Sequence, residues 1–562
     1  MSQSRLNAVA DRSGLLRQTV SLAPLAIVLL IFGALLSVFQ YRGELGESDL
    51  YRTLLGILSG QANGLGLDDP LHYGRNFSFG YIELIYLLSG NTSPADRNVL
   101  VSIINAVGYV SAVVALAGIM VSVWIVYGQP AAIITGIVFG FSPIMLSIGL
   151  SGHQLLPALA FFGAASVALL AETTGWRRGV AYFVGAVLLF LGLTMRAELP
   201  LGFPWLVLAQ RMPVRFDSFL RTALQRTAVC LLAFGAFLAV RHQILSAKPD
   251  EGNLGSIGAF FATFYRLDDI FPGLVAITLG CGVATLAVGG LAILAEAAAI
   301  LRQRPGIRGL WPSRAPLLAP LALILCGLVF WLPNPYPARH FTFVLLGFAV
   351  LIGAVLVRHF RLGSRAAIAI GAGIVVANQA ASEIAHPVIM ARLQSPYTNL
   401  PEERRTLTAA PLGFFWRHAA AMKQRREALT AFGRQIEASC EPSLLVLSDQ
   451  LHHLASNTFH HGRATTASPH SIGPYEGIEV TSPGRRTIYL TALLSSDTRT
   501  SWNTGQEQGA SDALSLVLAS EALREFQIAQ DPYSRSIYDR TPIPQDRRAA
   551  LQTAGAPDRV CP

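Results

Sequence analysis

The stretch VSLAPLAIVLLIFGALLSVF, residues 20–39, contains no charged side chain. A helix needs ~20 apolar residues to cross the ~30 Å hydrocarbon layer of a bilayer, so this stretch predicts a transmembrane helix. A second stretch, VLVSIINAVGYVSAVVALAGIMVSVWIVY, residues 99–127, is of the same kind. Similar apolar runs recur between short loops as far as about Ala381. The sequence therefore predicts an all-α polytopic membrane domain.

The composition supports this class of protein. Of the 562 residues, 52% are hydrophobic and only 14% are charged, whereas soluble domains carry about 25% charged residues. The net charge of +9 does not indicate nucleic acid, because the arginines lie in loops and in the tail, without a basic face interleaved with aromatic residues. Membrane lipids are the expected surroundings, and no nucleic-acid partner is expected.

The arginines predict the orientation of the chain in the cytoplasmic (inner) membrane. Arg5, Arg12 and Arg17 precede the first apolar run, so residues 1–19 should be a cytoplasmic amino terminus. Because this run lacks a small-residue cleavage site, we interpret it as a retained helix. About eleven helices follow one another between residues 20 and 382, with four arginine-rich loops on the inner side and a long outer loop over residues 40–98. The third helix is expected at 131–148, and the segments from Arg196 to Ala209 are short enough to be half-helices.

Residues 383–562 differ in character, being polar and without apolar runs long enough to span. Ser443–Ser448 and Thr487–Thr491 are typical of short buried strands, and residues 403–438 and 510–527 of amphipathic helices. We expect a small soluble α/β domain, and the helix parity places it outside the cytoplasm, in the periplasm. Cys440 and Cys561 are the cysteines of this domain, and an oxidising compartment would permit a disulfide if their Cα atoms lie within about 7 Å.

The familiar signatures of soluble enzymes are not found in the sequence, so chemistry must be sought among ionisable residues at helix ends. The first candidates are Glu47 and Asp49, just after the first helix on the predicted outer side. A carboxylate at this place can take a proton from an incoming hydroxyl group. Alternatively, Ser48 or Asp49 could serve as the N-cap of a helix over residues 50–58.

The second candidates lie further along the outer loop: Asp68, Asp69, Tyr73 and Arg75. Adjacent carboxylates can bind a hard cation or the hydroxyl groups of a sugar, although Asp-Pro also opens ordinary turns. A divalent cation is thus compatible with the loop, but no cofactor is firmly implied and no metal site is predicted. Zinc is disfavoured in the tail, because its five histidines lack a familiar ligand spacing. These are His452, His453, His460, His461 and His470.

The third group lies at other helix ends on the same predicted face. It consists of Arg196 and Glu198 after the fifth helix, and Arg339 and His340 after the ninth. A guanidinium group matches the oxygens of a lipid phosphate, but these arginines could also extend to lipid headgroups, or Arg196 could pair with Glu198. His153, between the third and fourth helices, either joins this site or caps a helix.

Together these features resemble the GT-C superfamily of membrane glycosyltransferases, which use polyprenyl-phosphate sugar donors. The resemblance implies a cytoplasmic amino terminus, an acidic motif just after the first helix and several transmembrane spans. This chain has Glu-Ser-Asp where many members have Asp-Glu or Asp-x-Asp, which leaves open whether Glu47 or Asp49 is the base. The matching segments, all within residues 20–358, are Glu47–Tyr51, His72–Gly80, Tyr81–Leu88, Arg196–Glu198 and Pro335–Arg339.

The resemblance implies transfer of a hexosyl or pentosyl group from a polyprenyl-phosphate sugar to an acceptor hydroxyl group at the outer face. Asp49 would activate the hydroxyl, and Arg196 or Arg339 would stabilise the departing phosphate. The acceptor could be a glycan, a lipid or a protein. Two other classes compete: a transporter or lipid flippase, which would place charged or broken helices at the membrane midplane, and a non-catalytic scaffold.

Overall fold

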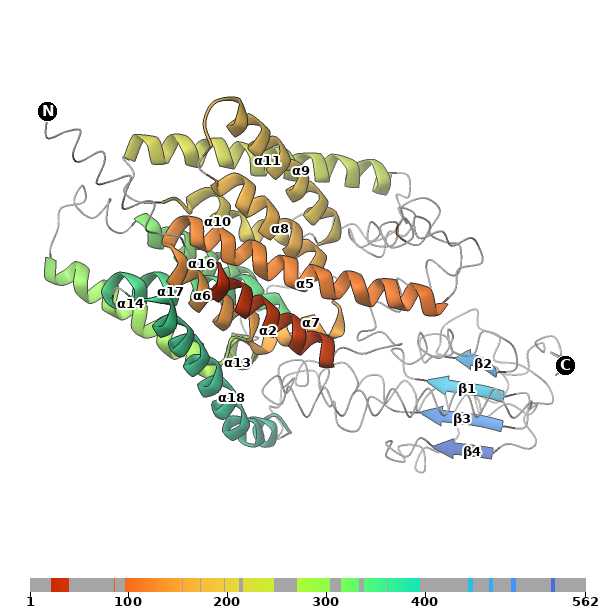
Figure 1. The fold of residues 1–562 in the computed structure, drawn as a ribbon. Helices are drawn as coiled ribbons and strands as arrows, with labels where there is room; N and C mark the ends of the chain where they lie inside the picture. Colours follow the sequence, from red (N-terminus) through yellow and green to blue (C-terminus); the bar gives the residue numbers. More distant parts are fainter. Residues whose placement is uncertain are drawn as a thin grey trace, which may run out of the picture.

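A computed structural model provides the fold (Figure 1). The structure describes residues 22–39, 85, 97–153, 155–171, 173–196, 198–211, 216–246, 270–303, 315–332, 338–360 and 362–394, together with four strands at 443–447, 464–467, 487–491 and 527–530. Glu47, Asp49, Asp68, Asp69, Tyr73, Arg75, the tail histidines, Cys440 and Cys561 lie outside these residues.

The described part of residues 22–394 is a bundle of helices. The first half contains α2 (Ala23–Phe39), α5 (Arg97–Tyr127), α6 (Gln129–Gly140), α7 (Pro143–Ser151), α8 (Leu155–Leu170), α9 (Trp176–Met195), the 3₁₀ turn η2 (Leu199–Gly202) and α10 (Phe203–Leu208). The second half contains α11 (Phe216–Ser246), α13 (Ile270–Cys281), α14 (Val283–Gln303), η4 (Ala315–Leu317), α16 (Leu318–Trp331), η5 (Ala338–Phe341), α17 (Thr342–Phe360) and α18 (Ser364–Gln394).

Within these described residues, five helices are long and apolar enough to cross a membrane, and a sixth span results if the bent pair α6 and α7 is counted as one. Four shorter apolar helices accompany them: Ala23–Val38, Leu155–Leu170, Leu199–Leu208 and Leu318–Trp331. The chain is therefore a multi-pass helical membrane protein, while the number of eleven spans stays a prediction.

Helix α17 forms the centre of the bundle, with 83% of its most apolar window buried by α16, α6 and α14. At the side, α5 and α8 approach so closely that their backbones touch. A Cβ atom added to Gly118 of α5 would lie 2.6 Å from the carbonyl carbon of Gly163 in α8. Small residues allow such contact, which is how helices gain van der Waals energy inside a membrane.

The sequence predicted one helix over residues 131–148, and this prediction was wrong in shape. The structure divides the segment into α6 and α7, which meet at an angle of 61°. Pro143 cannot donate a backbone hydrogen bond, and the Ser142 side chain accepts one from the Met145 N–H at 3.2 Å, so a new helix begins here. The segment from Arg196 to Ala209, which is short enough for half-helices, contains η2 and α10.

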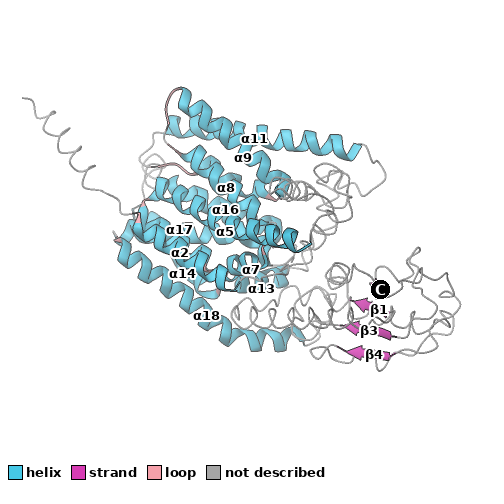
Figure 2. Cartoon of the chain, turned by 45° about the vertical axis from the view of Figure 1, so that its right-hand side comes forward, coloured by secondary structure: helices cyan, strands magenta, loops and turns pink. Residues whose placement is uncertain are grey.

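Two further features concern the end of the bundle and the tail. Helix α18 continues to Gln394, past residue 383, where the sequence predicts the start of the soluble domain. In the tail, four strands form one parallel sheet in the order β2-β1-β3-β4 (Figure 1), and Figure 2 shows the helical bundle and this sheet coloured by secondary structure. Their bounds are Ser443–Leu447 (β1), Ala464–Ala467 (β2), Thr487–Thr491 (β3) and Gln527–Gln530 (β4). The two amphipathic helices predicted at residues 403–438 and 510–527 lie outside the described residues, apart from Gln527. This residue, the last of the second predicted helix, begins β4 instead. The small α/β domain therefore stays a prediction.

Candidate functional site

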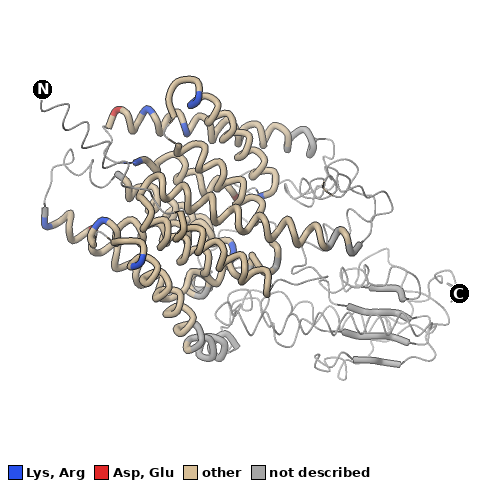
Figure 3. The backbone as a smooth tube through the Cα atoms, in the orientation of Figure 1, with Lys and Arg blue, Asp and Glu red and all other residues tan. Residues whose placement is uncertain are grey.

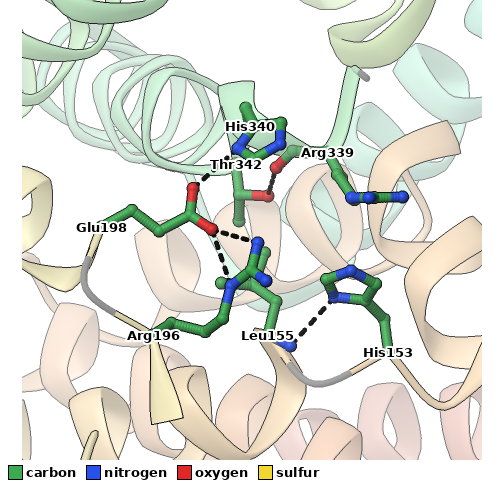
Figure 4. Close-up of polar contacts among 7 residues, drawn as sticks. All are labelled: His153, Leu155, Arg196, Glu198, Arg339, His340 and Thr342. Carbon is green, nitrogen blue, oxygen red and sulfur yellow. Dashed lines mark hydrogen bonds and ion pairs between the residues drawn. The ribbon is translucent and has the colours of Figure 1, made fainter. Parts of the chain in front are cut away.

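Five of the predicted site residues lie together at one end of the bundle, although they come from separate segments of the chain (Figure 4). Arg196 and Glu198 follow α9, Arg339 and His340 belong to η5, and His153 joins α7 to α8. The structure also packs η5 against α7 and α13. The helix ends therefore bring together three segments that are far apart in the sequence.

The turn after α9 aims Arg196 and Glu198 at each other. Arg196 has an extended backbone with φ −149°, which ends the helix, and Pro200 then opens the 3₁₀ turn η2. The Arg196 Nε–H donates to Glu198 Oε1 at 2.8 Å, and its Nη2 pairs with the same oxygen. The ion pair between Arg196 and Glu198, which was one of the alternatives in the sequence analysis, is thus observed. Any contact of Arg196 with a phosphate must therefore form in the presence of this ion pair.

The second oxygen of Glu198 binds the other segment. His340 Nδ1 lies 2.8 Å from Glu198 Oε2, and the two side chains are 11% and 12% exposed. An ionised carboxylate only accepts hydrogen bonds, so His340 Nδ1 carries a proton. Trp331, at the end of α16, packs its ring 4.3 Å from the His340 ring between centroids and fixes its position from the other side. The sequence analysis did not single out Trp331.

The charge of Glu198 follows from its neighbours. Burial by itself would raise the pKa of this carboxyl group, but the charges of Arg196 and His340 and their hydrogen bonds outweigh burial and hold the pKa well below its usual range. Glu198 is therefore ionised at neutral pH. A group in this state is a poor general base and serves to orient the two side chains that it binds.

His153 is held by the backbone of the helix that follows it. Its Nδ1 accepts a hydrogen bond from the Leu155 N–H at 2.9 Å, and its carbonyl oxygen accepts one from the Leu156 N–H at 2.9 Å. These are the contacts of a helix N-cap, so the capping role offered as an alternative for His153 is observed. The side chain is nevertheless 1% exposed and faces the cluster, so the two roles are compatible (Figure 4).

A second polar cluster, which the sequence analysis missed, lies at the opposite end of α17. Glu296 of α14 is buried and its Oε1 lies 2.9 Å from His359 Nε2 and 3.7 Å from Arg358 Nη1. With 19 residues at 1.5 Å each, α17 separates the two clusters by about 28 Å, close to the ~30 Å thickness of a bilayer core. The candidate site therefore lies at one membrane face and the Glu296 cluster at the other.

No group of three or more His, Cys, Asp or Glu residues suited to a metal ion occurs among the described residues. The cluster in Figure 4 instead combines two guanidinium groups and two imidazole rings with one carboxylate. Guanidinium groups match the oxygens of an anion such as phosphate, so the chemistry of these side chains is compatible with an anionic ligand.

No family model matches the sequence, and no curated protein matches it either. Among solved structures, the chain is similar to ArnT from Cupriavidus metallidurans bound to undecaprenyl phosphate, with 14% identity, a TM-score of 0.48, and coverage of 79% of this chain and 85% of that one. It is also similar to the Archaeoglobus fulgidus oligosaccharyltransferase in the apo form, with 12% identity, a TM-score of 0.43, and coverage of 80% and 65%.

Proposed function

We propose that this protein is a membrane glycosyltransferase that transfers a sugar from a polyprenyl-phosphate donor to an acceptor hydroxyl group. The observation that carries the proposal is the cluster of Arg196, Arg339, His340 and His153 at helix ends, in which Arg196 and His340 bind the carboxylate of Glu198 (Figure 4). Arginine presents a planar fork of donors that matches phosphate oxygens.

The depth of the cluster supports a lipid-linked anion. It lies at the end of α17, about 28 Å from the opposite cluster, and therefore at the level of lipid headgroups. A polyprenyl phosphate can place its phosphate at this level while its chain stays in the hydrocarbon. A water-soluble sugar nucleotide would gain nothing from a site at this depth.

The proposed reaction needs one general base and one positively charged side chain that stabilises the departing phosphate. Asp49, with Glu47 as the alternative, takes the proton from the acceptor hydroxyl group. The oxygen then forms a bond to the anomeric carbon, and the bond from that carbon to the phosphate oxygen breaks. The lipid phosphate departs with the electron pair, and Arg196 or Arg339 stabilises its charge. Asp68, Asp69, Tyr73 and Arg75 would contact the sugar or the acceptor.

The proposal includes an orientation. Many of the Lys and Arg residues of the described helices lie at the end of the bundle where α11 begins and α14 ends (Figure 3). The positive-inside rule favours the cytoplasm for that end, and hence the outer face for the candidate site. We accordingly propose about eleven spans in an inner membrane, a cytoplasmic amino terminus and an outer location for residues 383–562.

A transporter or lipid flippase is the second candidate function, because such proteins contain broken transmembrane helices. Among the described helices, breaks lie at Phe141–Ser142 between α6 and α7 and at Gly282 between α13 and α14. Neither break carries an ionisable side chain, and the buried cluster lies at helix ends. The arrangement therefore favours the transferase.

The test is binding of decaprenyl phosphate to the purified protein in detergent, with the phosphate-free alcohol decaprenol as the reference ligand. Arg339→Gln should weaken binding of the phosphate about 10- to 100-fold, because a hydrogen bond to a charged group contributes about 1.5–3 kcal/mol. Arg302→Gln is the matched control, since Arg302 is exposed in the last turn of α14 at the opposite end.

Equal affinity of the unmodified protein for decaprenyl phosphate and decaprenol would refute the proposal. So would equal losses in the Arg339 and Arg302 variants. Transfer itself is then measured with a panel of polyprenyl-phosphate hexoses and pentoses, which identifies the sugar.

A further inference from the structure

A charged side chain, Arg226 of α11, is buried between helices. It lies in the stretch Phe216–Val240, which is apolar enough to cross a membrane, and is 6% exposed, whereas Arg221 on the same helix is exposed. A guanidinium group keeps its charge inside a protein, so its burial requires hydrogen-bond acceptors. Ionisable residues within transmembrane helices are costly, and their partners indicate what they do.

The acceptors of Arg226 are carbonyl groups at the end of a short helix. Its Nη1 donates to the carbonyl oxygen of Ala209 at 2.6 Å and to that of Leu206 at 3.4 Å. Leu206 lies in the last turn of α10, and Ala209 ends the helix with an extended backbone. The last carbonyl groups of a helix have no partner within it, and both of these residues are 0% exposed. Arg226 therefore caps the carboxyl end of α10, where a positive charge also suits the helix dipole.

The other end of the same segment carries Glu198. The turn η2 and helix α10 follow one another without a gap over Leu199–Leu208, and Glu198 immediately precedes them. With 4 residues at ~2.0 Å and 6 residues at ~1.5 Å, this segment is about 17 Å long. Hydrogen bonds thus join the segment to other helices at both ends, to His340 through Glu198 and to Arg226 through Leu206 and Ala209.

Close packing transmits position along the segment. A Cβ atom added to Gly202, the last residue of η2, would lie 2.5 Å from Cε2 of Phe162 and 2.6 Å from Cε1 of Phe343. The segment has no room to bend toward these rings, and protein interiors are only slightly compressible. A shift of its carboxyl end therefore reaches Glu198. The bond of 2.8 Å between Glu198 and His340 tolerates only a few tenths of an ångström before its geometry is lost.

We propose that Arg226 is a positioning residue of the candidate site: it holds the segment Leu199–Leu208 along its axis and thereby places Glu198 against His340. Because about 17 Å of helix lies between its bonds and Glu198, Arg226 acts through the segment. The inference concerns the geometry of the cluster, and its consequence for phosphate binding rests on the proposed function.

Two substitutions test the role of the buried guanidinium group. Arg226→Met keeps a long side chain without donors, and Arg226→Lys keeps a positive charge with three donors. The readout is ¹⁵N solid-state NMR of the histidine-labelled protein, in which the Nδ1–H signal of His340 reports its bond to Glu198. The spectrum of His340→Gln is subtracted to assign this signal. Arg226→Met should shift the signal or abolish it, and Arg226→Lys should restore it.

Two control variants separate positioning from a general loss of stability. Arg221→Met removes an exposed arginine of the same helix and should leave the His340 signal unchanged. Leu116→Ala opens a cavity at a buried position of α5, so it should lower the melting temperature and also leave the signal unchanged. If Arg226→Met does not fold, Arg226→Gln takes its place, because its shorter side chain retains amide donors and should still shift the signal.

An unchanged His340 signal in the folded Arg226 variant would overturn the inference. An equal shift in Leu116→Ala would also overturn it, because the effect would then follow stability alone. Binding of decaprenyl phosphate should be about tenfold weaker in Arg226→Met and close to that of the unmodified protein in Arg226→Lys. Failure of the unmodified protein to prefer decaprenyl phosphate over decaprenol would refute the proposed function, whereas the His340 signal would still decide the positioning role.

Discussion

At the scale of single residues, Glu198 organises the described part of the site. One carboxylate oxygen binds Arg196 and the other binds His340, so the segment after α9 is joined to η5 through one side chain. The low pKa of Glu198 keeps it ionised through the neutral range, so the link is lost only in acid, as the pH falls through that low pKa. Such a group positions the Arg196 and His340 side chains, and the base of the proposed reaction must be sought elsewhere.

Asp49 is the proposed base, because it follows the first helix on the predicted outer side and its motif resembles that of the family. Asp49→Asn keeps the size of the side chain and its hydrogen bonding but cannot accept a proton. Loss of a positioned base typically lowers the rate about 10²–10⁴-fold. The measurement is sugar transfer by purified variants at equal folded amounts.

Glu47→Gln is the internal control for this experiment. A larger loss of transfer rate in Glu47→Gln than in Asp49→Asn would assign the role of the base to Glu47. If Asp49 only caps a helix, Asn would serve equally well and turnover should remain close to that of the unmodified protein.

The sequence located individual site residues better than their contacts. Alternation of the helices was enough to expect Arg196, Glu198, Arg339 and His340 at one face, because each follows a span of the same parity. The bond from Glu198 to His340 joins residues 142 positions apart and depends on helix packing that a single sequence does not encode locally. Trp331 was missed because an aromatic residue at the end of an apolar run is typical of any transmembrane helix.

At the scale of secondary-structure elements, hydrophobic length predicted the helices and failed at their breaks. The runs at 20–39 and 99–127 correspond to α2 and α5. The run 131–148 was expected to be one helix, because its apolar composition continues through Ser142 and Pro143. At a break in a membrane helix, backbone N–H groups lose their acceptors within the helix and need other partners. Nearby side chains provide these partners, and the pattern of apolar residues along the sequence does not reveal them.

The break between α13 and α14 gives a prediction of stability. Gly282 has φ +89°, and the buried Thr285 N–H in the first turn of α14 donates to Asn378 Oδ1 of α18 at 3.1 Å, while Asn378 Nδ2 donates to Thr285 Oγ1 at 2.8 Å. Asn378→Leu removes both bonds and leaves a buried N–H without its partner, which costs about 1–3 kcal/mol. We expect a lower melting temperature in detergent, measured by intrinsic fluorescence.

Gln379→Leu is the matched control, since it changes a neighbouring side chain of α18 that is only partly buried. Similar melting temperatures for Asn378→Leu and the unmodified protein would show that α14 does not depend on this cap.

At the scale of the whole molecule, the two ends of the bundle differ in charge and in burial. One end carries exposed or half-exposed arginines, among them Arg302 and Arg358, whereas the other buries Arg196 at 5% exposure beside Glu198. Exposed arginines are suited to lipid headgroups and resist translocation, and a buried arginine requires specific partners. This asymmetry links the orientation of the chain to the position of the site.

The orientation can be tested independently of any ligand. Alkaline phosphatase folds only outside the cytoplasm, so a fusion after Pro562 should be active if residues 383–562 lie outside. A fusion after Leu362, in the basic loop that follows α17, should be inactive, because one fewer span precedes it. A green fluorescent protein series at the same two positions should give the opposite pattern. An inactive phosphatase together with a fluorescent fusion at Pro562 would invert the proposed topology, and the cluster of Arg196, Glu198 and His340 would then face the cytoplasm, where a donor of different chemistry would have to reach it.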